Sequence, residues 1–307
     1  MQEQILKSAR AFFPFFAALL LFTGAASAQT PPQPQQPLRV DKEVRIYGQK
    51  IHYVEAGSSG PVVILLHGLG GNSSHWTLNI NALAANHRVI VPDQVGFGQS
   101  DKPLVNYRVA TYVDFLDRLY NELKIERATL VGNSMGGWVA ALYAVAHPQK
   151  VERLVLVDAA GFAPPKEFDI KQLSALNPST RDGIRQLALR VFYNKQLFAS
   201  DAAIDLMLTQ RMTAGDGYTI QSLVDSIERR EDMLDGRLAA IRQPTLIIWG
   251  REDGLTPLAE VGERFKREIA GAELLVFEQC GHMPMVEKAA EFNAALLKFL
   301  APQPKAK

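Results

Sequence analysis

The chain has 307 residues, of which 47% are hydrophobic and 21% are charged, and its formal net charge is +1. This length suffices for one large α/β domain with an insertion, and the composition is ordinary for a globular enzyme. A near-neutral charge gives no general electrostatic surface for nucleic acid or an anionic membrane. The single cysteine, Cys280, excludes an internal disulfide, and the six histidines show no metal-ligand spacing. We therefore expect no nucleic-acid partner, no metal and no cofactor.

The first 28 residues predict a signal peptide. Lys7 and Arg10 precede an apolar run over residues 11–26, and residues 26–28 read Ala-Ser-Ala, the small-x-small pattern of a cleavage site. The run is too short for a comfortable membrane span, which needs about 20 residues. We expect an exported, periplasmic or secreted protein with no stable membrane span after cleavage. An uncleaved N-terminal membrane anchor is the alternative.

Residues 29–42 are predicted to be a Pro/Gln-rich linker, because QTPPQPQQP cannot form a helix or a central strand. Short aliphatic runs then predict buried strands. In chain order these runs are 44–47, 51–55, 62–66, 89–91, 129–131, 154–157, 246–249 and 274–277. The first two flank Gly48 as a hairpin. The clearest helices are expected at 107–123, 135–146 and 287–300.

Alternation of strands and helices predicts a mostly parallel, doubly wound α/β sheet. One segment, residues 162–239, shows no strand runs, and its apolar residues recur at helical spacing instead. We expect this segment to be a helical cap inserted into a core formed by residues 43–161 and 240–302.

Residues 132–137, GNSMGG, predict a nucleophile. They follow an apolar strand and open an Ala-rich helix, which is the context that G-x-S-x-G requires. The chain must turn sharply there, and Gly132 and Gly136 remove side chains that would collide. Ser134 is therefore expected to project its hydroxyl above the sheet edge. The backbone N–H of Met135 would face a developing oxyanion at the helix N-terminus.

A serine hydroxyl needs a base at neutral pH, and the base must lie on another loop at the same sheet edge. His282 follows the last strand and Asp253 follows the strand before it, giving the chain order Ser, Asp, His. We predict His282 as general base and Asp253 as the acid that orients it. Glu252 and Asp158, which also follow strands, are the rival acids, with Asp158 ranked above Glu252.

The second oxyanion donor is expected in HGLGG, residues 67–71, as the backbone N–H of Leu69. His67 is interpreted as a residue that fixes this loop. Trp76 and Met283 are candidates for the substrate pocket. Arg190 and Arg211, in the predicted cap, are candidates for binding a carboxylated substrate, although a solvated helix-face arginine is the more common role.

Together these segments resemble the α/β-hydrolase superfamily from about Arg45 to Leu300. The matching pieces are HGLGG at 67–71, DQVGFGQSDKP at 93–103, GNSMGG at 132–137, GREDGLTP at 250–257 and CGHMP at 280–284. The resemblance implies an α/β-hydrolase fold with an eight-stranded sheet, and a flanking structural role for the segment that contains Asp93. Relatives that are haloalkane dehalogenases or epoxide hydrolases use an aspartate nucleophile, so Ser134 argues against both activities.

The resemblance covers two kinds of serine hydrolase. Our main prediction is a capped esterase or lipase that cleaves a small-molecule carboxylic ester through an acyl-enzyme. The alternative is a meta-cleavage-product hydrolase, which cuts carbon–carbon bonds. That group typically carries tryptophan directly after the catalytic histidine, where this chain has Met283. A third reading, a hydrolase-like fold used only for binding, is opposed by the complete triad.

Overall fold

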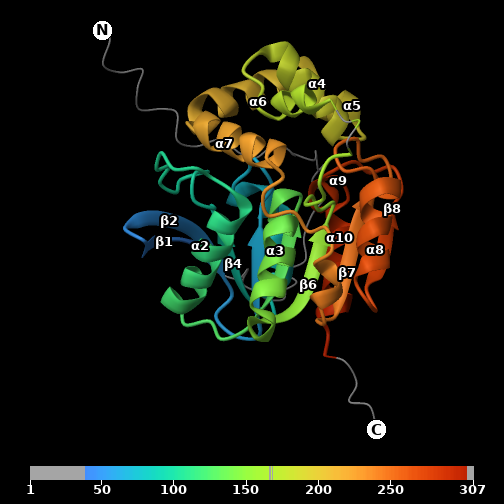
Figure 1. Cartoon of the computed structure of the whole chain (residues 1–307). Coiled ribbons are helices and arrows are strands. Elements are labelled where there is room, and N and C mark those ends of the chain that lie inside the picture. The colour runs from blue at the N-terminus through green and yellow to red at the C-terminus, as the bar shows by residue number, and fades with distance from the viewer. Residues whose placement is uncertain (1–38, 166, 168, 303–307) are drawn as a thin grey trace, which may run out of the picture. The chain divides into compact units, whose positions relative to one another are not determined.

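The computed structural model describes residues 39–302 apart from 166 and 168, and of residues 170 and 171 only the backbone. The predicted signal peptide and most of the predicted linker lie outside the described residues. Eight strands form one sheet in the order β1-β2-β4-β3-β5-β6-β7-β8, in which the pairs β1–β2 and β2–β4 are antiparallel and all other pairs are parallel (Figure 1). This confirms the predicted sheet. The strands are β1 (Arg39–Ile46), β2 (Gln49–Ala56), β3 (Val62–Leu66), β4 (Arg88–Pro92), β5 (Ala128–Asn133), β6 (Val151–Val157), β7 (Thr245–Gly250) and β8 (Glu273–Phe277).

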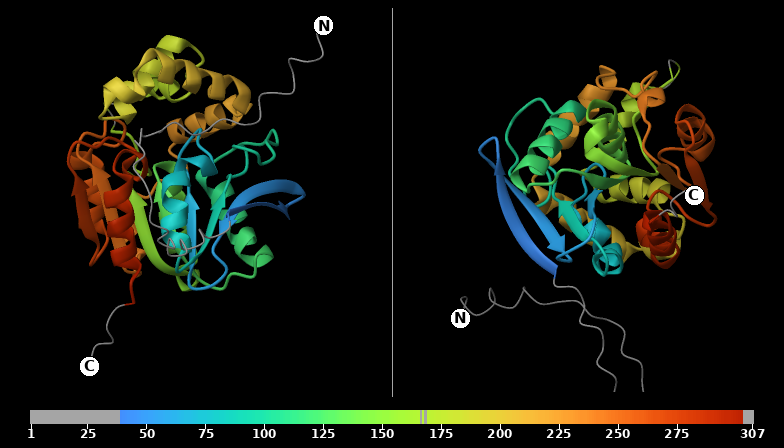
Figure 2. Two further views of the ribbon diagram at one scale, coloured as in Figure 1. Left: turned by 180° about the vertical axis from the view of Figure 1, so that it is seen from behind. Right: turned by 90° about the horizontal axis from the view of Figure 1, so that it is seen from below.

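The first two strands form the expected hairpin, which projects from one side of the sheet (Figure 2). Tyr47 and Gly48 form its turn with φ of 50° and 79°, as a tight two-residue hairpin requires. The predicted linker reaches four residues too far, because β1 already begins at Arg39. Most side chains in the first part of this edge strand are exposed, so residues 39–43 lack an apolar run like those that revealed the other strands.

Helices cover both faces of the sheet (Figures 1 and 2). In β3, Ile64 and Leu66 point to one face and Val63 and Leu65 to the other, and all four are buried. Burying each such side chain stabilises the fold by about 1.5–3 kcal/mol. One face packs against α2 (Val109–Glu122), α3 (Met135–Ala146) and α8 (Glu263–Glu268), and the other against α1 (Thr77–Ala84), α9 (Pro284–Glu287) and α10 (Ala289–Leu300). Short turns lie at η1 (Ser73–Trp76), η2 (Pro148–Lys150) and η5 (Leu258–Gly262).

The segment between β6 and β7 is helical and contains no strand among the residues that the structure describes. Its elements are η3 (Ile170–Leu176), α4 (Arg181–Val191), α5 (Lys195–Phe198), α6 (Asp201–Ala214), α7 (Gly217–Glu228) and η4 (Leu238–Ala240). Helices α4, α5, α6 and α7 lie above one edge of the sheet (Figure 1), whereas η4 packs against α3 and α8. Ser200 caps α6 by accepting a hydrogen bond from the N–H of Ala203. Ile184, Ala188, Ala199 and Ile204 form a small core of their own inside this cap.

The cap meets the sheet edge through α7. A methyl group added to Gly70, in the loop after β3, would lie 3.3 Å from Cδ1 of Ile220. One added to Gly96, in the loop after β4, would lie 2.6 Å from Cγ2 of Thr219. Helix α7 therefore packs directly on the loops that follow these strands. None of the described helices has the length and apolar character needed to cross a membrane.

Candidate active site

Ser134 lies between β5 and α3 with φ 56° and ψ −120°, a conformation that costs a non-glycine residue about 1–3 kcal/mol. The surrounding backbone imposes it: the N–H of Ser134 donates to the carbonyl of Val157 at 3.0 Å. A side chain on Gly132 would collide with the carbonyl of Gly136, and one on Gly136 would collide with the carbonyl of Leu66. Both glycines are thus required for the sharp turn that lifts Ser134 to the sheet edge, where it is partly exposed.

The structure brings His282 and Asp253 together from the loops after β8 and β7. Nδ1 of His282 lies 2.7 Å from Oδ2 of Asp253, and both side chains are almost fully buried. Burial by itself raises the pKa of Asp253, but the charge and hydrogen bond of His282 and the hydrogen bonds of Thr256 and Leu255 outweigh it and lower that pKa. Asp253 is therefore ionised at neutral pH and holds one imidazole nitrogen, as an orienting acid must.

Hydrogen bonds to the main chain hold His282 in place. Its N–H donates to the carbonyl of Val191 at 2.6 Å, and its carbonyl accepts from Nδ2 of Asn133 at 3.0 Å. Asn133 directly precedes Ser134, and its amide also reaches the carbonyl of Val157 at 3.2 Å. The loop of the nucleophile and the loop of the base are thus joined by one side chain.

The HGLGG loop runs against the nucleophile. A methyl group on Gly68 would lie 3.0 Å from Cβ of Ser134, so the backbone that leads to Leu69 passes beside the serine. Met135, which directly follows Ser134, is the first residue of α3, so its N–H is at the N-terminus of that helix. Two N–H groups in these positions are suited to binding an oxyanion.

The imidazole ring of His67 holds this loop in place through hydrogen bonds to the main chain. Its Nδ1 lies 2.8 Å from the carbonyl of Gly68, and its Nε2 accepts from the backbone N–H of Gln94 at 3.0 Å. Because a backbone N–H can only donate, the ring proton must lie on Nδ1. Burial lowers the pKa of His67, so the ring is neutral. The side chain of Gln94 also donates to the carbonyl of His67 at 2.8 Å.

The rival acids have other partners. Glu252 turns away and accepts a hydrogen bond from the N–H of Cys280 at 2.9 Å. Asp158 is fully buried, and one oxygen each of Asp158 and Asp253 and one ring nitrogen of His282 lie within 4.8 Å of one another. That spacing would also suit a metal ion, but Nδ1 of His282 and Oδ2 of Asp253 already bind one another. Of the three acids, Asp253 makes the direct bond to His282, which is the geometry expected of the orienting acid.

Of the pocket candidates, Met283 lies beside His282 and is 9% exposed. Trp76 is 0% exposed and packs on Phe292 with ring centroids 6.1 Å apart. Trp76 is therefore a core residue, and its assignment to a substrate pocket is wrong. The partner that buries it lies more than 200 residues further along the chain.

Both arginines are engaged within the protein. Nε of Arg190 donates to the carbonyl of Gly254 at 3.1 Å, and the N–H of Gly254 donates back to the carbonyl of Arg190 at 3.1 Å, so Arg190 braces the loop of Asp253. Arg211 forms an ion pair with buried Asp216, and its Nη2 lies 2.5 Å from Oδ1 of Asn177. Asp216 neutralises the charge of Arg211, which does not support a role in binding a substrate carboxylate.

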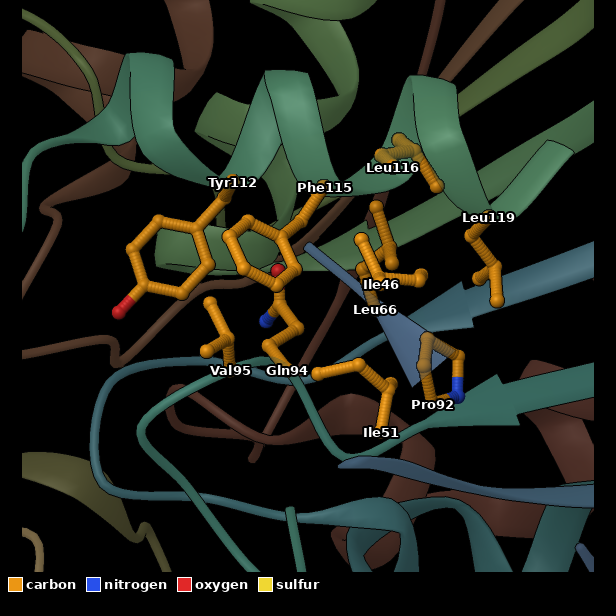
Figure 3. A pocket seen from close by; sticks show the side chains of 10 residues that line it. All are labelled: Ile46, Ile51, Leu66, Pro92, Gln94, Val95, Tyr112, Phe115, Leu116 and Leu119. Carbon is orange, nitrogen blue, oxygen red and sulfur yellow. The ribbon is translucent and has the colours of Figure 1, made fainter. Parts of the chain in front are cut away.

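An apolar pocket lies between α2 and the first strands of the sheet (Figure 3). Its lining contains none of Ser134, Asp253 and His282. The pocket is therefore separate from the triad. One lining residue, Gln94, also contacts the HGLGG loop, because its side chain donates to the carbonyl of His67. Its lining residues are Ile46, Ile51, Leu66, Pro92, Gln94, Val95, Tyr112, Phe115, Leu116 and Leu119.

Sequence reasoning missed Thr256 and Asn133. Oγ1 of Thr256 lies 2.6 Å from Oδ2 of Asp253 and its N–H donates to Oδ1 at 3.1 Å. A hydroxyl residue three positions after the acid is a local signal that could have revealed Thr256, because such residues cap nearby turns. Asn133 has no comparable signal, since its partner His282 is distant in sequence.

Comparison with known proteins identifies the family. The profile of the α/β-hydrolase fold family matches residues 61–289, and the chain belongs to this family. A relative, the 2-hydroxymuconate semialdehyde hydrolase of Pseudomonas sp. strain CF600, is 33% identical over 87% of this chain and 96% of its own.

Two solved structures are also similar. A membrane phospholipase A, described as a bacterial virulence factor, is 28% identical with a TM-score of 0.77 over 85% of this chain and 86% of its own. A meta-cleavage product hydrolase from Pseudomonas fluorescens IP01 is 30% identical with a TM-score of 0.75 over 84% and 97%. The chain is thus an α/β hydrolase similar both to carbon–carbon bond hydrolases and to lipases.

Proposed function

We propose that this protein is a serine hydrolase that cleaves small-molecule carboxylic esters through an acyl-enzyme. The observation that carries the proposal is the Asp253–His282 pair at the sheet edge where the strained turn presents Ser134. His282 takes the proton of Ser134 as the hydroxyl attacks the carbonyl, and the N–H groups of Leu69 and Met135 bind the oxyanion. Water activated by His282 then releases the acid.

A carbon–carbon bond hydrolase of the meta-cleavage type is the second candidate. The names of the sequence relatives support it more directly than they support ester hydrolysis, since the first relatives are hydrolases of 2-hydroxymuconate semialdehyde and of nonadienedioates. Against it stand Met283 in place of tryptophan and the internal pairing of Arg211. The membrane phospholipase A and a putative lipase among the structural neighbours favour esters.

We further propose that the protein acts outside the cytoplasm, in the periplasm or in the medium. The support is the sequence of residues 1–28 alone. Fractionation of cells that express the tagged full chain would test this: recovery of shortened protein beginning at Gln29 in the periplasm or medium supports it, and full-length protein in the cytosol contradicts it.

The first experiment is a turnover panel on the full chain, with p-nitrophenyl esters of graded chain length and one coloured meta-cleavage dienol. Ser134→Ala should lower kcat/KM for the preferred substrate by about 10⁴ to 10⁶. The matched control is Ser59→Ala, an exposed serine in the loop before β3. Preference for esters supports the first candidate and preference for the dienol the second. Unchanged turnover in Ser134→Ala would refute both.

A further inference from the structure

Asp158 occupies an unusual place at the end of β6. It is 0% exposed and has φ 43°, a left-handed conformation that side chains rarely adopt. Three contacts with β7 and its following loop hold it there. Its N–H donates to the carbonyl of Ile248 at 3.0 Å, its Oδ1 accepts from the N–H of Gly250 at 2.9 Å, and Oγ1 of Thr256 lies 3.1 Å from its carbonyl. Strain maintained in this way marks functional positions.

The second oxygen, Oδ2 of Asp158, is buried and has no hydrogen-bond donor among the described residues. The carboxylate of Asp253 lies beside it, within the 4.8 Å cluster that includes His282. Two neighbouring carboxylates in a buried site do not both ionise, and one retains a proton. Without that proton Oδ2 would be an unsatisfied buried charge, whereas with it the group becomes a donor.

The surroundings decide which carboxyl keeps the proton. Asp253 accepts from four donors, namely Nδ1 of His282, the N–H of Leu255, and the N–H and hydroxyl of Thr256. Among the described residues, the carboxyl group of Asp158 accepts from one donor only, the backbone N–H of Gly250. Burial and the negative charge of Asp253 raise the pKa of Asp158 well above its usual range, and Glu287 adds to the effect. The charge therefore stays on Asp253 and the proton on Asp158.

We propose that Asp158 is a second carboxyl group of the catalytic centre, protonated and directed at Asp253 while Asp253 is ionised, and able to become the charged partner of His282 when the charge of Asp253 is removed. It is a positioning residue, since it acts on the reaction through Asp253. The catalytic part of this inference rests on the proposed serine hydrolase function, whereas the protonation state does not.

The protonation state can be measured without a substrate, by infrared difference spectroscopy of the full chain at neutral pH. The wild-type protein should show the carbonyl stretch of a buried protonated carboxyl group, and Asp158→Asn should lack it. Glu287→Gln is the matched control, because Glu287 is the other partly buried acid near this centre with a raised pKa, and it should leave the Asp158 band in place. An identical band in wild type and Asp158→Asn overturns the proposal.

The proposed ability of Asp158 to replace Asp253 as the charged partner of His282, its reserve role, is tested by a double-mutant cycle. The cycle uses Asp158→Asn, Asp253→Asn and the double variant, on the substrate that the wild-type enzyme turns over best. Asparagine keeps the size of the side chain, so all three variants should fold, which circular dichroism would verify. Asp253→Asn should lower kcat/KM by about 10³ to 10⁴. Asp158→Asn should cost less than about tenfold in the wild-type background but more than about tenfold in Asp253→Asn.

The dependence of kcat/KM on pH distinguishes the reserve role from a purely structural role of Asp158, which would leave the shape of the profile unchanged. In Asp253→Asn the residual kcat/KM should fall at low pH as Asp158 takes up its proton, and the double variant should lack this step. Equal effects of Asp158→Asn in both backgrounds, or identical profiles, overturn the reserve role. If no substrate is turned over, the serine hydrolase proposal fails, while the infrared result still decides the state of Asp158.

Discussion

At the scale of single residues, the triad is held together by side chains outside it. Thr256 reaches Asp253 with both its hydroxyl and its N–H, and Asn133 ties the carbonyl of His282 to the loop of Ser134. Each hydrogen bond to a charged group contributes about 1.5–3 kcal/mol. Such contacts keep the imidazole in one orientation, which the reaction requires at every turnover.

Thr256→Val should therefore lower kcat/KM by about ten- to a hundredfold, because the isosteric side chain keeps its volume but loses the 2.6 Å hydrogen bond to Asp253. Losing this donor also raises the pKa of Asp253. Steady-state kinetics on the preferred ester would measure the effect. Thr256→Ser, which keeps the hydroxyl, should retain most of the activity, and an equal loss in both variants would contradict the role.

The candidate site residues that could be located from the sequence are those with local signals. Ser134 carries its own glycine frame, and His282 and Asp253 each follow a strand. Arg211 and Trp76 could not be placed, because each has a partner from a distant segment: Asn177 for the arginine and Phe292 for the tryptophan. A side chain's charge or apolar surface is visible in the sequence, but the group that satisfies it is not.

At the scale of elements, the key unit is β5, the turn at Ser134 and α3. The helix starts so close to β3 that a side chain on Gly136 would collide with the carbonyls of Leu66 and His67. The same β3 leads directly into the oxyanion loop. The close packing of α3 on β3 therefore positions the nucleophile and both oxyanion donors together.

Gly136→Ala should destabilise the protein by about 3 kcal/mol or more, because the new methyl group meets rigid backbone that cannot move aside. Urea unfolding would measure the change. Gly217→Ala is the matched control: a methyl group there would lie 3.6 Å from Nη2 of Arg211, an ordinary contact, at the first residue of α7. Comparable stability of the two variants would show that Gly136 is not a close-packing glycine.

Most elements were predictable from the sequence, because strands buried on both faces read as continuous aliphatic runs. The exception is the start of β1, where the polar sequence RVDKE at residues 39–43 resembles a loop. Its pairing with β2 depends on the tight turn at Tyr47 and Gly48 rather than on burial. The helical character of the cap was predictable from spacing, but the loops on which α7 would rest were not.

At the scale of the whole molecule, the cap contacts the catalytic loops at two places. Helix α7 covers the loops after β3 and β4, and the end of α4 is bonded to the loops of the acid and the base. At the second place the carbonyl of Val191 accepts from the N–H of His282, and Arg190 braces Gly254. Movement of the cap would therefore change the positions of His282 and Asp253 directly.

Glu287 is central to this second contact. Its Oε1 accepts from the N–H of Gly281 at 2.9 Å, beside the base, and its Oε2 accepts from the N–H of Tyr193 at 2.8 Å, in the cap. Burial raises the pKa of this carboxyl group. An ionised carboxylate offers two acceptor oxygens, one to each segment, which an amide or a protonated acid cannot do equally well.

Glu287→Gln should thus detach the cap segment at residues 191–194 while leaving the sheet intact. Because an amide has one acceptor, either Gly281 or Tyr193 loses its partner, so amide hydrogen exchange at 191–194 should rise and kcat/KM should fall about tenfold. Glu278→Gln, an exposed acid in the loop after β8 paired with Arg251, is the control and should change neither.

As pH falls, Glu287 takes up a proton at a higher pH than an ordinary glutamate, so amide hydrogen exchange at 191–194 in the wild-type protein should approach that of the variant. Unchanged protection of 191–194 in Glu287→Gln would show that the cap is held by its other contacts alone.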